Sequence, residues 1–411
     1  MIRTLLLLGA SGDLARRFLL PALGSLLEAG RLPEGFRIVG AARGELDEED
    51  LQSLAGDDIP AEMLAYRAVD LADHSTLAGA LGETSDPVAA YLALPPALFP
   101  TAIGSLGERR LPAGSRIVVE KPFGEDLESA RELNSLLAQT GLDVYRVDHV
   151  LGMETVQNLA ALRQGNPVLD RVWNGEGVEL VEILWEETLA LEGRAGYYDH
   201  AGALKDVLQN HMLQLLALIG MEPLAEGESV HERKIDVFQS VRIATTSRRA
   251  RYTAGTLADG RQVGPYAEEA GVDPARCTET FAEVALRVEL PRWGGTRFVL
   301  RAGKALSDRR KLIRLHFRGG GEFEFGIDGP EDVVLRLTGG ADTPIELRAP
   351  PRDRLPPYAH VVLDVLGGTS ALSVSGEEAE QAWRIVAPVL ASWEAGSVPL
   401  EEYPAGSAGP P

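Results

Sequence analysis

The N-terminal part of the chain alternates short apolar runs with amphipathic segments. Residues 2–8 form a short run that is mainly apolar, and a glycine turn and an apolar pattern at helical spacing follow it. Further short apolar runs lie at residues 36–43, 63–70, 87–96 and 116–124. Short apolar runs separated by helical segments are typical of a parallel sheet with helices on both faces. The pattern therefore predicts a doubly wound α/β domain over residues 1–150.

From about residue 175 the pattern becomes mainly strand-like. Segments such as "GVELVEILWEE", "KIDVFQSVRIATT" and "TRFVLRAGKAL" are β-rich and lack long helices between them. Such a pattern predicts an α+β domain with a large, mainly antiparallel sheet over residues 151–402. Helical spacing within this part predicts helices at 206–220 and 375–396. The tail 403–411, rich in Gly and Pro, is predicted to be disordered.

Length and composition narrow the choice of partners. The chain has 411 residues, which fits two domains, and a net charge of −21. A surface this acidic repels nucleic acid and anionic lipid, so we expect a small-molecule ligand and neither of these partners. Cys277 is the only cysteine and the histidines lack ligand spacing, so we expect no disulfide and no metal. The first apolar run is too short for a signal peptide, and a cytoplasmic location is expected.

The segment "LLLLGASGDLA" indicates a phosphate-binding turn. It places Gly9, Gly12 and Ala15 between an apolar run and a helical pattern. Glycines there let the backbone approach a pyrophosphate, and the helix N-terminus supplies N–H donors. Because the spacing is G-x-x-G-x-x-A, a tight turn without a ligand remains an alternative. Arg43 ends the second apolar run, and no acid lies at 40–43, which favours the 2′-phosphate of NADP unless Arg43 is only a solvated surface residue.

Motifs along nearly the whole chain resemble those of one family. "GASGDLARR", "YLALPP", "EKPFG", "YRVDHVLG", "ETVQN", "KDVLQNH" and "LRAGKAL" are similar, in this order, to motifs of the glucose-6-phosphate dehydrogenase family. The resemblance implies a Rossmann domain followed by a β+α domain with a large mixed sheet. It also implies hydride transfer from C1 of a hexose phosphate to NADP, with NAD left open, and a lactone product. A homodimer formed through the β+α domain is implied as well.

The resemblance assigns roles to individual residues. His211 matches the family's base and Asp148 the acid that orients it, since a carboxylate beside an imidazole fixes the tautomer and stabilises the imidazolium. Lys121 matches a lysine at the cofactor–substrate junction, and its bond to Pro122 is a candidate for a cis peptide. The cofactor candidates are Gly9, Ser11, Gly12, Asp13, Leu14, Arg43, Pro95 and Lys121. The substrate candidates are Lys121, His149, Glu187, Asp206, Lys304 and Arg309, together with Phe18, Val150 and Met153.

Three of the substrate candidates, Phe18, Val150 and Met153, depart from the family pattern. Phe18 stands where the family usually has a basic residue, and Val150 and Met153 replace its tyrosine and lysine. A desolvated phosphate needs donors and positive charge, and each charge-assisted hydrogen bond is worth roughly 1.5–3 kcal/mol. Losing two would weaken binding by on the order of 100-fold or more. We therefore predict a changed substrate, a sugar without the 6-phosphate or with an apolar or amino substituent in its place.

Three alternatives stay open, and one of them is hydride transfer at a ring carbon other than C1, because the sequence does not fix the orientation of the substrate. An ordinary glucose-6-phosphate dehydrogenase would hold the phosphate through His149, Lys304 and Arg309 alone. A non-catalytic paralogue would bind the cofactor and act as a regulatory partner of another enzyme. Such paralogues normally lose the base or its orienting acid, whereas His211 and Asp148 are both present.

Overall fold

The chain forms two compact units. The computed structural model describes residues 1–44, 48–82, 84–109, 111–193, 195–328, 333–338, 345–349 and 355–411. Unit 1 comprises Met1–Glu154 and Asp353–Glu380, and unit 2 comprises Thr155–Arg352 and Gln381–Pro411. The first boundary lies near the expected one at 150. The expected second domain, 151–402, is not contiguous, because a C-terminal segment belongs to unit 1.

Unit 1 is built on a seven-stranded sheet in the order β17-β6-β5-β4-β1-β2-β3. Its neighbouring strands are parallel except for β17, which runs antiparallel to β6. The strands are β1 (Thr4–Leu8), β2 (Arg37–Ala42), β3 (Leu64–Ala68), β4 (Val88–Leu92), β5 (Arg116–Glu120), β6 (Asp143–Val147) and β17 (Ser373–Val374). The chain order reverses between β1 and β4, and ligands of such sheets bind at this switch point, beyond the carboxyl ends of the strands.

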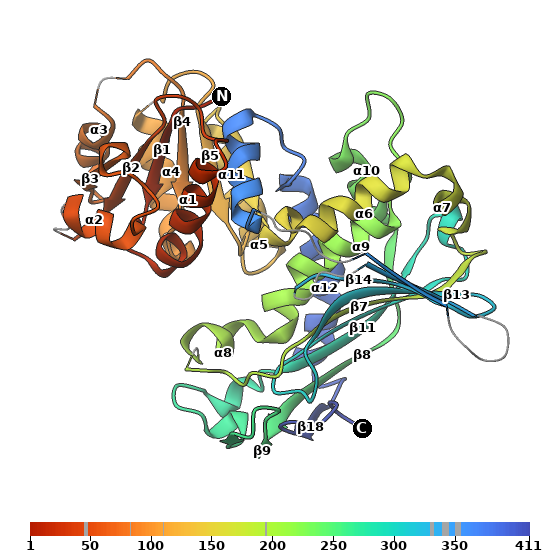
Figure 1. The fold of residues 1–411 in the computed structure, drawn as a ribbon. Coiled ribbons are helices and arrows are strands. Elements are labelled where there is room, and N and C mark those ends of the chain that lie inside the picture. The colour runs from red at the N-terminus through yellow and green to blue at the C-terminus, as the bar shows by residue number, and fades with distance from the viewer. Residues whose placement is uncertain are drawn as a thin grey trace. The chain divides into compact units, whose positions relative to one another are not determined.

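Helices cover both faces of this sheet (Figure 1). One layer holds α1 (Leu20–Glu28), α2 (Glu48–Ala55) and α11 (Pro357–Gly367), and the other holds α3 (His74–Leu81), α4 (Phe99–Arg109) and α5 (Leu127–Gln139). The strand β1 is buried along its whole length, as its continuous apolar run predicts. On one face Leu5 and Leu7 share a core with Tyr358, Val361 and Leu366 of α11. This shared core explains why a segment from the end of the chain belongs to unit 1.

Unit 2 contains a nine-stranded sheet in the order β16-β15-β14-β13-β7-β12-β11-β8-β18. Its pairs are antiparallel except β7 with β12 and β8 with β18, which confirms a mixed, mainly antiparallel sheet. The strands are β7 (Val178–Glu186), β8 (Val241–Thr253), β11 (Phe281–Val288), β12 (Arg297–Gly303), β13 (Arg310–Phe317), β14 (Glu322–Gly326), β15 (Val333–Leu337), β16 (Ile345–Ala349) and β18 (Leu400–Pro404). A two-stranded sheet pairs β9 (Gly255–Thr256) with β10 (Gln262–Val263).

The helices of this part include both predicted ones, and one of the others, α10, stands where a strand was predicted. They are α6 (Glu154–Gly165), α7 (Pro167–Val172), α8 (Ala195–Ala203), the π-helical η5 (Leu204–Met212), α9 (Leu213–Gly220), α10 (Val230–Ser240) and α12 (Gly376–Glu394). The prediction of a strand that begins at Lys234 is wrong, because α10 continues to Ser240 and β8 starts at Val241. A capping box between Ser229 and Glu232 starts this helix. No helix among the described residues is long and apolar enough to cross a membrane.

The expectation of a disordered tail is also wrong. Residues 400–404 form β18, which extends the large sheet beside β8, and the side chain of Tyr403 is fully buried. Beyond the strand, the Gly406 N–H donates to the carbonyl of Ala305 at 2.7 Å, and the Ser307 N–H donates to the carbonyl of Ser407 at 2.8 Å. Composition suggested disorder, but backbone pairing to a sheet edge orders the segment.

Candidate active site

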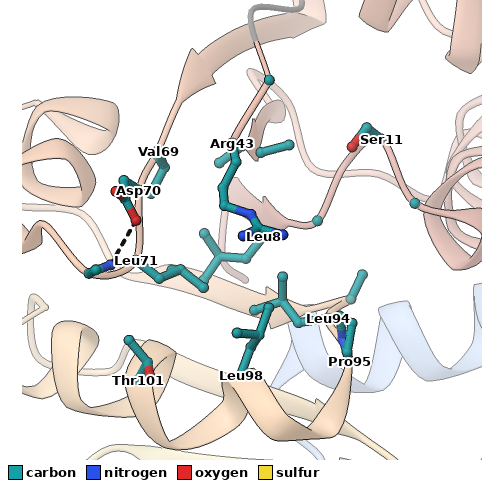
Figure 2. Close-up of a pocket in the computed structure, with 17 residues that line it drawn as sticks. Leu8, Ser11, Arg43, Val69, Asp70, Leu71, Leu94, Pro95, Leu98 and Thr101 are labelled. Carbon is teal, nitrogen blue, oxygen red and sulfur yellow. Dashed lines mark hydrogen bonds between the residues drawn. The ribbon is translucent and has the colours of Figure 1, made fainter.

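Unit 1 holds a cavity of about 490 Å³ at the carboxyl ends of β1, β2, β3 and β4. The loops after these four strands line it, and Figure 2 shows their side chains around the open space. Five of the cofactor candidates are among the lining residues: Gly9, Ser11, Gly12, Arg43 and Pro95. The cavity therefore lies at the switch point where a dinucleotide is expected in such a sheet.

The glycine turn is shaped for close approach of a ligand. Gly9 has φ 87°, and a Cβ there would lie 2.2 Å from the carbonyl oxygen of Ala93, so only glycine fits. The Gly12 N–H donates to the carbonyl of Gly9 at 2.9 Å, and the first helix of the chain follows at once. This bare turn before a helix fits the pyrophosphate of a dinucleotide. The residues present therefore fit the implied cofactor.

Arg43 brings a positively charged side chain to this cavity. Figure 2 shows its side chain extending from the end of β2 into the space between Asp70 and Ser11. The sequence did not single out Asp70, which follows β3 and accepts a hydrogen bond from the Ala72 N–H at 3.0 Å. Only the order of the strands brings the ends of β2 and β3 to one cavity.

Three further cofactor candidates do not line this cavity. Asp13 is exposed and pairs with Arg17 at 3.1 Å, and Leu14 packs against the hydrophobic core of unit 1. Lys121 follows β5, and its bond to Pro122 is cis, as the sequence analysis expected. The cofactor roles of Asp13, Leu14 and Lys121 stay predictions.

Beside Lys121, unit 1 contains a buried carboxyl and two tyrosines. Glu120 is 7 % exposed, and the hydroxyls of Tyr91 and Tyr358 hydrogen-bond to its side chain. Burial raises the pKa of Glu120 to about 7, against the opposing effects of the Tyr91 hydrogen bond and the positive charge of Lys121. Glu120 therefore changes charge near neutral pH, next to a residue expected at the cofactor–substrate junction.

The turn that carries Asp148 and His149 lies in the same unit. Asp148 is 1 % exposed and accepts a hydrogen bond from the Val150 N–H at 3.2 Å, which caps the turn His149–Gly152. The His149 ring stacks on Tyr358 with centroids 5.7 Å apart. Val150 and Met153 are buried.

Phe18 meets the same tyrosine from the first helix. Its ring centroid lies 5.6 Å from that of Tyr358, and the Arg17 guanidinium lies 5.4 Å from the Phe18 ring. Phe18 is 43 % exposed. The rings of Phe18, His149 and Tyr358 thus form one aromatic cluster. Phe18 and His149 could be predicted from the sequence but Tyr358 could not, because its position depends on the packing of α11 in unit 1.

In unit 2, His211 lies on the irregular helix η5. Its ring stacks on Trp185 of β7 with centroids 5.3 Å apart, and the side chain is 2 % exposed. The Asn210 side chain supports the helix, because its amide donates to the carbonyls of Lys205 and Asp206 at 3.0 and 3.1 Å. Its oxygen accepts the His211 N–H at 2.6 Å. Irregular π-helical turns of this kind are frequent at functional sites.

A network of charges lies next to Trp185. Glu187 pairs with Lys304 at 2.6 Å and with Lys311 at 3.0 Å, and the Lys311 ammonium lies 4.7 Å from the Trp185 ring centroid. Burial alone would raise the pKa of Glu187, but the charges of the two lysines lower it to about 2. Glu187 is therefore ionised throughout the neutral range and holds two ammonium groups just beyond the carboxyl end of β7.

The remaining substrate candidates of unit 2 also have charged neighbours. Arg309 pairs with Asp328 at 2.7 Å, and Lys311 reaches the same carboxylate at 3.1 Å. The Asp206 carboxylate hydrogen-bonds to Tyr197. No sequence motif points to Trp185, Lys311 or Asp328, because β7 and β13 become neighbours only in the folded sheet.

The structure thus divides the candidates between the units. Unit 1 carries Asp148 with Lys121, His149, Val150, Met153 and Phe18, whereas unit 2 carries His211 with Glu187, Asp206, Lys304 and Arg309. The pairing of Asp148 with His211 and the roles of the substrate candidates stay predictions.

Comparison with known proteins covers both units. Residues 6–158 match the model of the glucose-6-phosphate dehydrogenase NAD-binding domain, and residues 160–348 and 342–411 match the model of the C-terminal domain of that enzyme. The glucose-6-phosphate 1-dehydrogenase of Gluconobacter oxydans is 35% identical over 98% of this chain and 93% of its own length. That of Treponema pallidum is 34% identical over 99% of this chain and 92% of its own length.

A solved structure gives the same result. Glucose-6-phosphate dehydrogenase in complex with its substrate glucose-6-phosphate superposes with a TM-score of 0.89 at 30% identity, covering 100% of this chain and 96% of that chain. The alignment with the Gluconobacter oxydans enzyme spans 458 positions, more than the 411 residues of this chain, so that relative carries insertions. Both domain models, the full-length relatives and the fold agree, and the chain belongs to the glucose-6-phosphate dehydrogenase family.

Proposed function

We propose that this protein is an NADP-dependent sugar 1-dehydrogenase, which oxidises the C1 hydroxyl of a hexose to the lactone. The observation that carries the proposal is the full-length match to one dehydrogenase family in a chain that retains His211, Asp148 and Lys121. The cofactor cavity with its bare glycine turn supports it. No observation favours the non-catalytic regulatory alternative.

In the proposed reaction His211 removes the proton from the C1 hydroxyl. When bound, the nicotinamide cofactor supplies the acceptor for the hydride that leaves C1. We propose that Asp148 orients the His211 imidazole and stabilises the imidazolium that forms. Trp185 holds the ring plane of His211 by stacking. Glu187 and Lys304 offer an acceptor and a donor to the sugar hydroxyls.

We propose NADP rather than NAD as the preferred cofactor. Arg43 lines the cavity at the end of β2, where an arginine accommodates the 2′-phosphate, and residues 40–43 include no acid. Asp70 also lines the cavity, but it follows β3 rather than β2.

For the substrate, we propose a hexose whose C6 end carries no phosphate. The three positions where the family resemblance leads us to expect phosphate donors hold Phe18, Val150 and Met153. Phe18 forms an aromatic cluster with His149 and Tyr358, and its own ring offers neither a hydrogen-bond donor nor a charge to a dianion. Val150 and Met153 are buried, and neither side chain offers a hydrogen-bond donor there.

The test is a panel of glucose, glucose 6-phosphate and 6-deoxy- or 6-amino-hexoses with NADP and with NAD. We expect a higher kcat/KM for an unphosphorylated hexose, and we expect His211→Asn to abolish turnover with every sugar. A preference for glucose 6-phosphate would overturn the substrate proposal and leave the sugar dehydrogenase proposal standing. No turnover above the His211→Asn background with any sugar would overturn both.

A triple variant tests the three positions directly. Phe18→Lys with Val150→Tyr and Met153→Lys restores the expected donors, so kcat/KM for glucose 6-phosphate should rise by about 100-fold. Arg3 is exposed and lies away from these residues, so Arg3→Lys is the control. It should leave kcat/KM for glucose 6-phosphate unchanged. If the triple variant folds and gains nothing, these residues do not exclude the phosphate.

The resemblance also leads us to propose a cytoplasmic homodimer. Sedimentation velocity measures the assembly state directly. A monomer over the micromolar range would contradict the proposed dimer.

A further inference from the structure

We propose that Glu279 is a positioning residue that holds the start of the helix carrying Asp206 and His211. This inference rests on the proposed function, because it assigns Glu279 to the part of unit 2 that acts on the sugar. Glu279 lies outside every candidate set described above. Its contacts connect the large sheet to η5.

Glu279 is fixed to the sheet through its neighbour. It lies just before β11, and the next residue, Thr280, donates its N–H to the carbonyl of Ala250 at 2.8 Å. The carbonyl of Thr280 accepts the N–H of Lys304 at 2.9 Å. Glu279 itself is 7 % exposed. Its backbone therefore shares a rigid frame with the substrate candidate Lys304.

From this frame Glu279 binds the junction between α8 and η5 twice. Its carbonyl accepts the N–H of Ala203 at 3.2 Å, and its Oε1 accepts the N–H of Leu204 at 2.9 Å. Between the two helices Gly202 adopts φ 63° and ψ 177°. A Cβ at this position would lie 2.4 Å from the Glu279 Oε1, so the glycine makes room for the carboxyl.

These contacts set where η5 begins. The first N–H groups of a helix have no partner within the helix and need an external acceptor. Leu204 is the first residue of η5, and Asp206 and His211 follow on the same element. The Asn210 side chain already replaces part of the regular hydrogen bonding of this helix. Release of the Leu204 N–H would therefore move both Asp206 and His211.

The Glu279 carboxyl changes its charge near neutral pH. Burial raises its pKa to about 7, and the Leu204 N–H, Arg249 and Lys205 oppose this rise. The other titratable groups that face it are Tyr198 and Tyr266, whose own pKa values are raised by burial, so both stay neutral. Opening of the junction lets water reach the carboxylate, whose pKa then falls towards 4.5, so ionisation favours opening and the junction is held more firmly below pH 7.

Hydrogen exchange on the full chain tests the proposal without relying on activity. Glu279→Ala removes the acceptor, and exchange in residues 204–212 should become about fivefold faster, the size expected for a lost cap. Glu279→Gln keeps an oxygen acceptor and should restore the wild-type rate. In wild type, exchange corrected for intrinsic rates should become faster from pH 6 to pH 8, whereas Glu279→Gln should show no such change.

A matched control lies on β11, the strand that follows Glu279. Glu283 pairs with Arg301 at 2.6 Å, and Glu283→Gln should leave exchange in 204–212 at the wild-type rate. If Glu279→Ala exchanges like this control, or if Glu279→Gln keeps the wild-type pH dependence, the proposal is overturned. If Glu279→Ala does not fold, the comparison of Glu279→Gln with wild type decides.

Kinetics give a second readout that separates positioning from general stability. Glu279→Ala should raise the KM for the sugar by about fivefold, and Glu279→Gln should restore it. A Glu279→Ala variant with a wild-type KM would contradict the proposal. If no sugar is turned over by the wild type, the proposed function fails, and the exchange result still decides the role of Glu279.

Discussion

The pKa values of individual carboxyl groups in this protein are shifted in opposite directions because their surroundings differ. Glu120 and Glu279 are buried away from water, which raises the pKa of each to about 7. Glu187 is also buried, but the ammonium groups of Lys304 and Lys311 lower its pKa to about 2. Sequence alone gave no sign of this difference, because all three are glutamates beside apolar strands.

The two raised pKa values predict a pH dependence of stability. A folded carboxyl with a raised pKa keeps its proton between pH 4.5 and 7, where the unfolded chain has lost it. The free energy of unfolding should therefore fall as pH rises across this window and then level off. Urea unfolding at pH 5 and pH 7 measures this change in the free energy of unfolding. Glu120→Gln and Glu279→Gln should each make the change smaller.

The exposed Glu62 provides the control for this measurement. Glu62→Gln should leave the slope of stability against pH as in wild type. Glu187 acts in the opposite sense, since its stabilisation is present above pH 4.5 and is lost only as pH falls towards 2. An unfolding free energy that rises from pH 5 to pH 7 would contradict the burial argument.

Arg43 predicts a change in cofactor choice. Arg43→Gln should raise the KM for NADP by roughly 10- to 100-fold, because one charge-assisted hydrogen bond to the 2′-phosphate is worth about 1.5–3 kcal/mol. The KM for NAD should stay the same, since NAD lacks this phosphate. Steady-state kinetics with both cofactors measure the ratio, and the exposed Arg3→Gln is the control. An equal rise for both cofactors would contradict the assignment.

Among the elements, the C-terminal strand β18 hydrogen-bonds directly to the substrate candidate Lys304. The Tyr403 hydroxyl donates to the carbonyl of Lys304 at 2.7 Å and lies 2.8 Å from the Thr280 hydroxyl. The Gly406 N–H binds the carbonyl of Ala305 in the same turn. The segment predicted to be disordered therefore braces the loop that holds Lys304.

Removal of this brace should weaken sugar binding. Tyr403→Phe loses the hydroxyl but keeps the ring, and it should raise the KM for the sugar several-fold and lower the Tm by a few degrees. Glu402→Gln is the matched control, because Glu402 on the same strand pairs only at the surface with Arg251. A Tyr403→Phe variant with wild-type KM would show that the tail does not position Lys304.

The hydrophobic pattern predicted most of the elements. The strands of unit 1 are continuous apolar runs, so their burial could be deduced from the sequence. The pattern misplaced residues 234–240, because a helix partly buried beside a sheet has a short apolar repeat that resembles a strand. The capping box from Ser229 to Glu232 was the available signal.

At the scale of the whole molecule, unit 1 is assembled from two separate parts of the sequence. The helix α11 contributes Tyr358, Val362 and Leu366 to the core around β1. The Ile2 N–H donates to the carbonyl of Leu366 at 3.0 Å, and β17 pairs with β6. A protein cut at the boundary near residue 150 therefore lacks part of its core.

A fragment experiment tests this dependence. Residues 1–154 alone should not show a cooperative thermal transition, because the apolar surface that α11 covers would be exposed. Joining residues 355–380 through a long flexible linker should restore the transition in near-UV circular dichroism. The linked fragment with Val362→Asp is the control and should stay unfolded. A cooperative transition of residues 1–154 at the temperature of the linked fragment would show that α11 is dispensable.

The sequence by itself determined the two-part α/β and α+β organisation, the phosphate-binding turn and the family, because apolar periodicity and short motifs are local properties of the chain. The tertiary structure decided which distant residues meet: α11 with β1, Tyr358 with Phe18 and His149, Trp185 with Lys311, and Glu279 with η5. It also decided that the tail is ordered. Such contacts depend on strand order and on the burial of groups far apart in sequence, and local patterns carry no information about either.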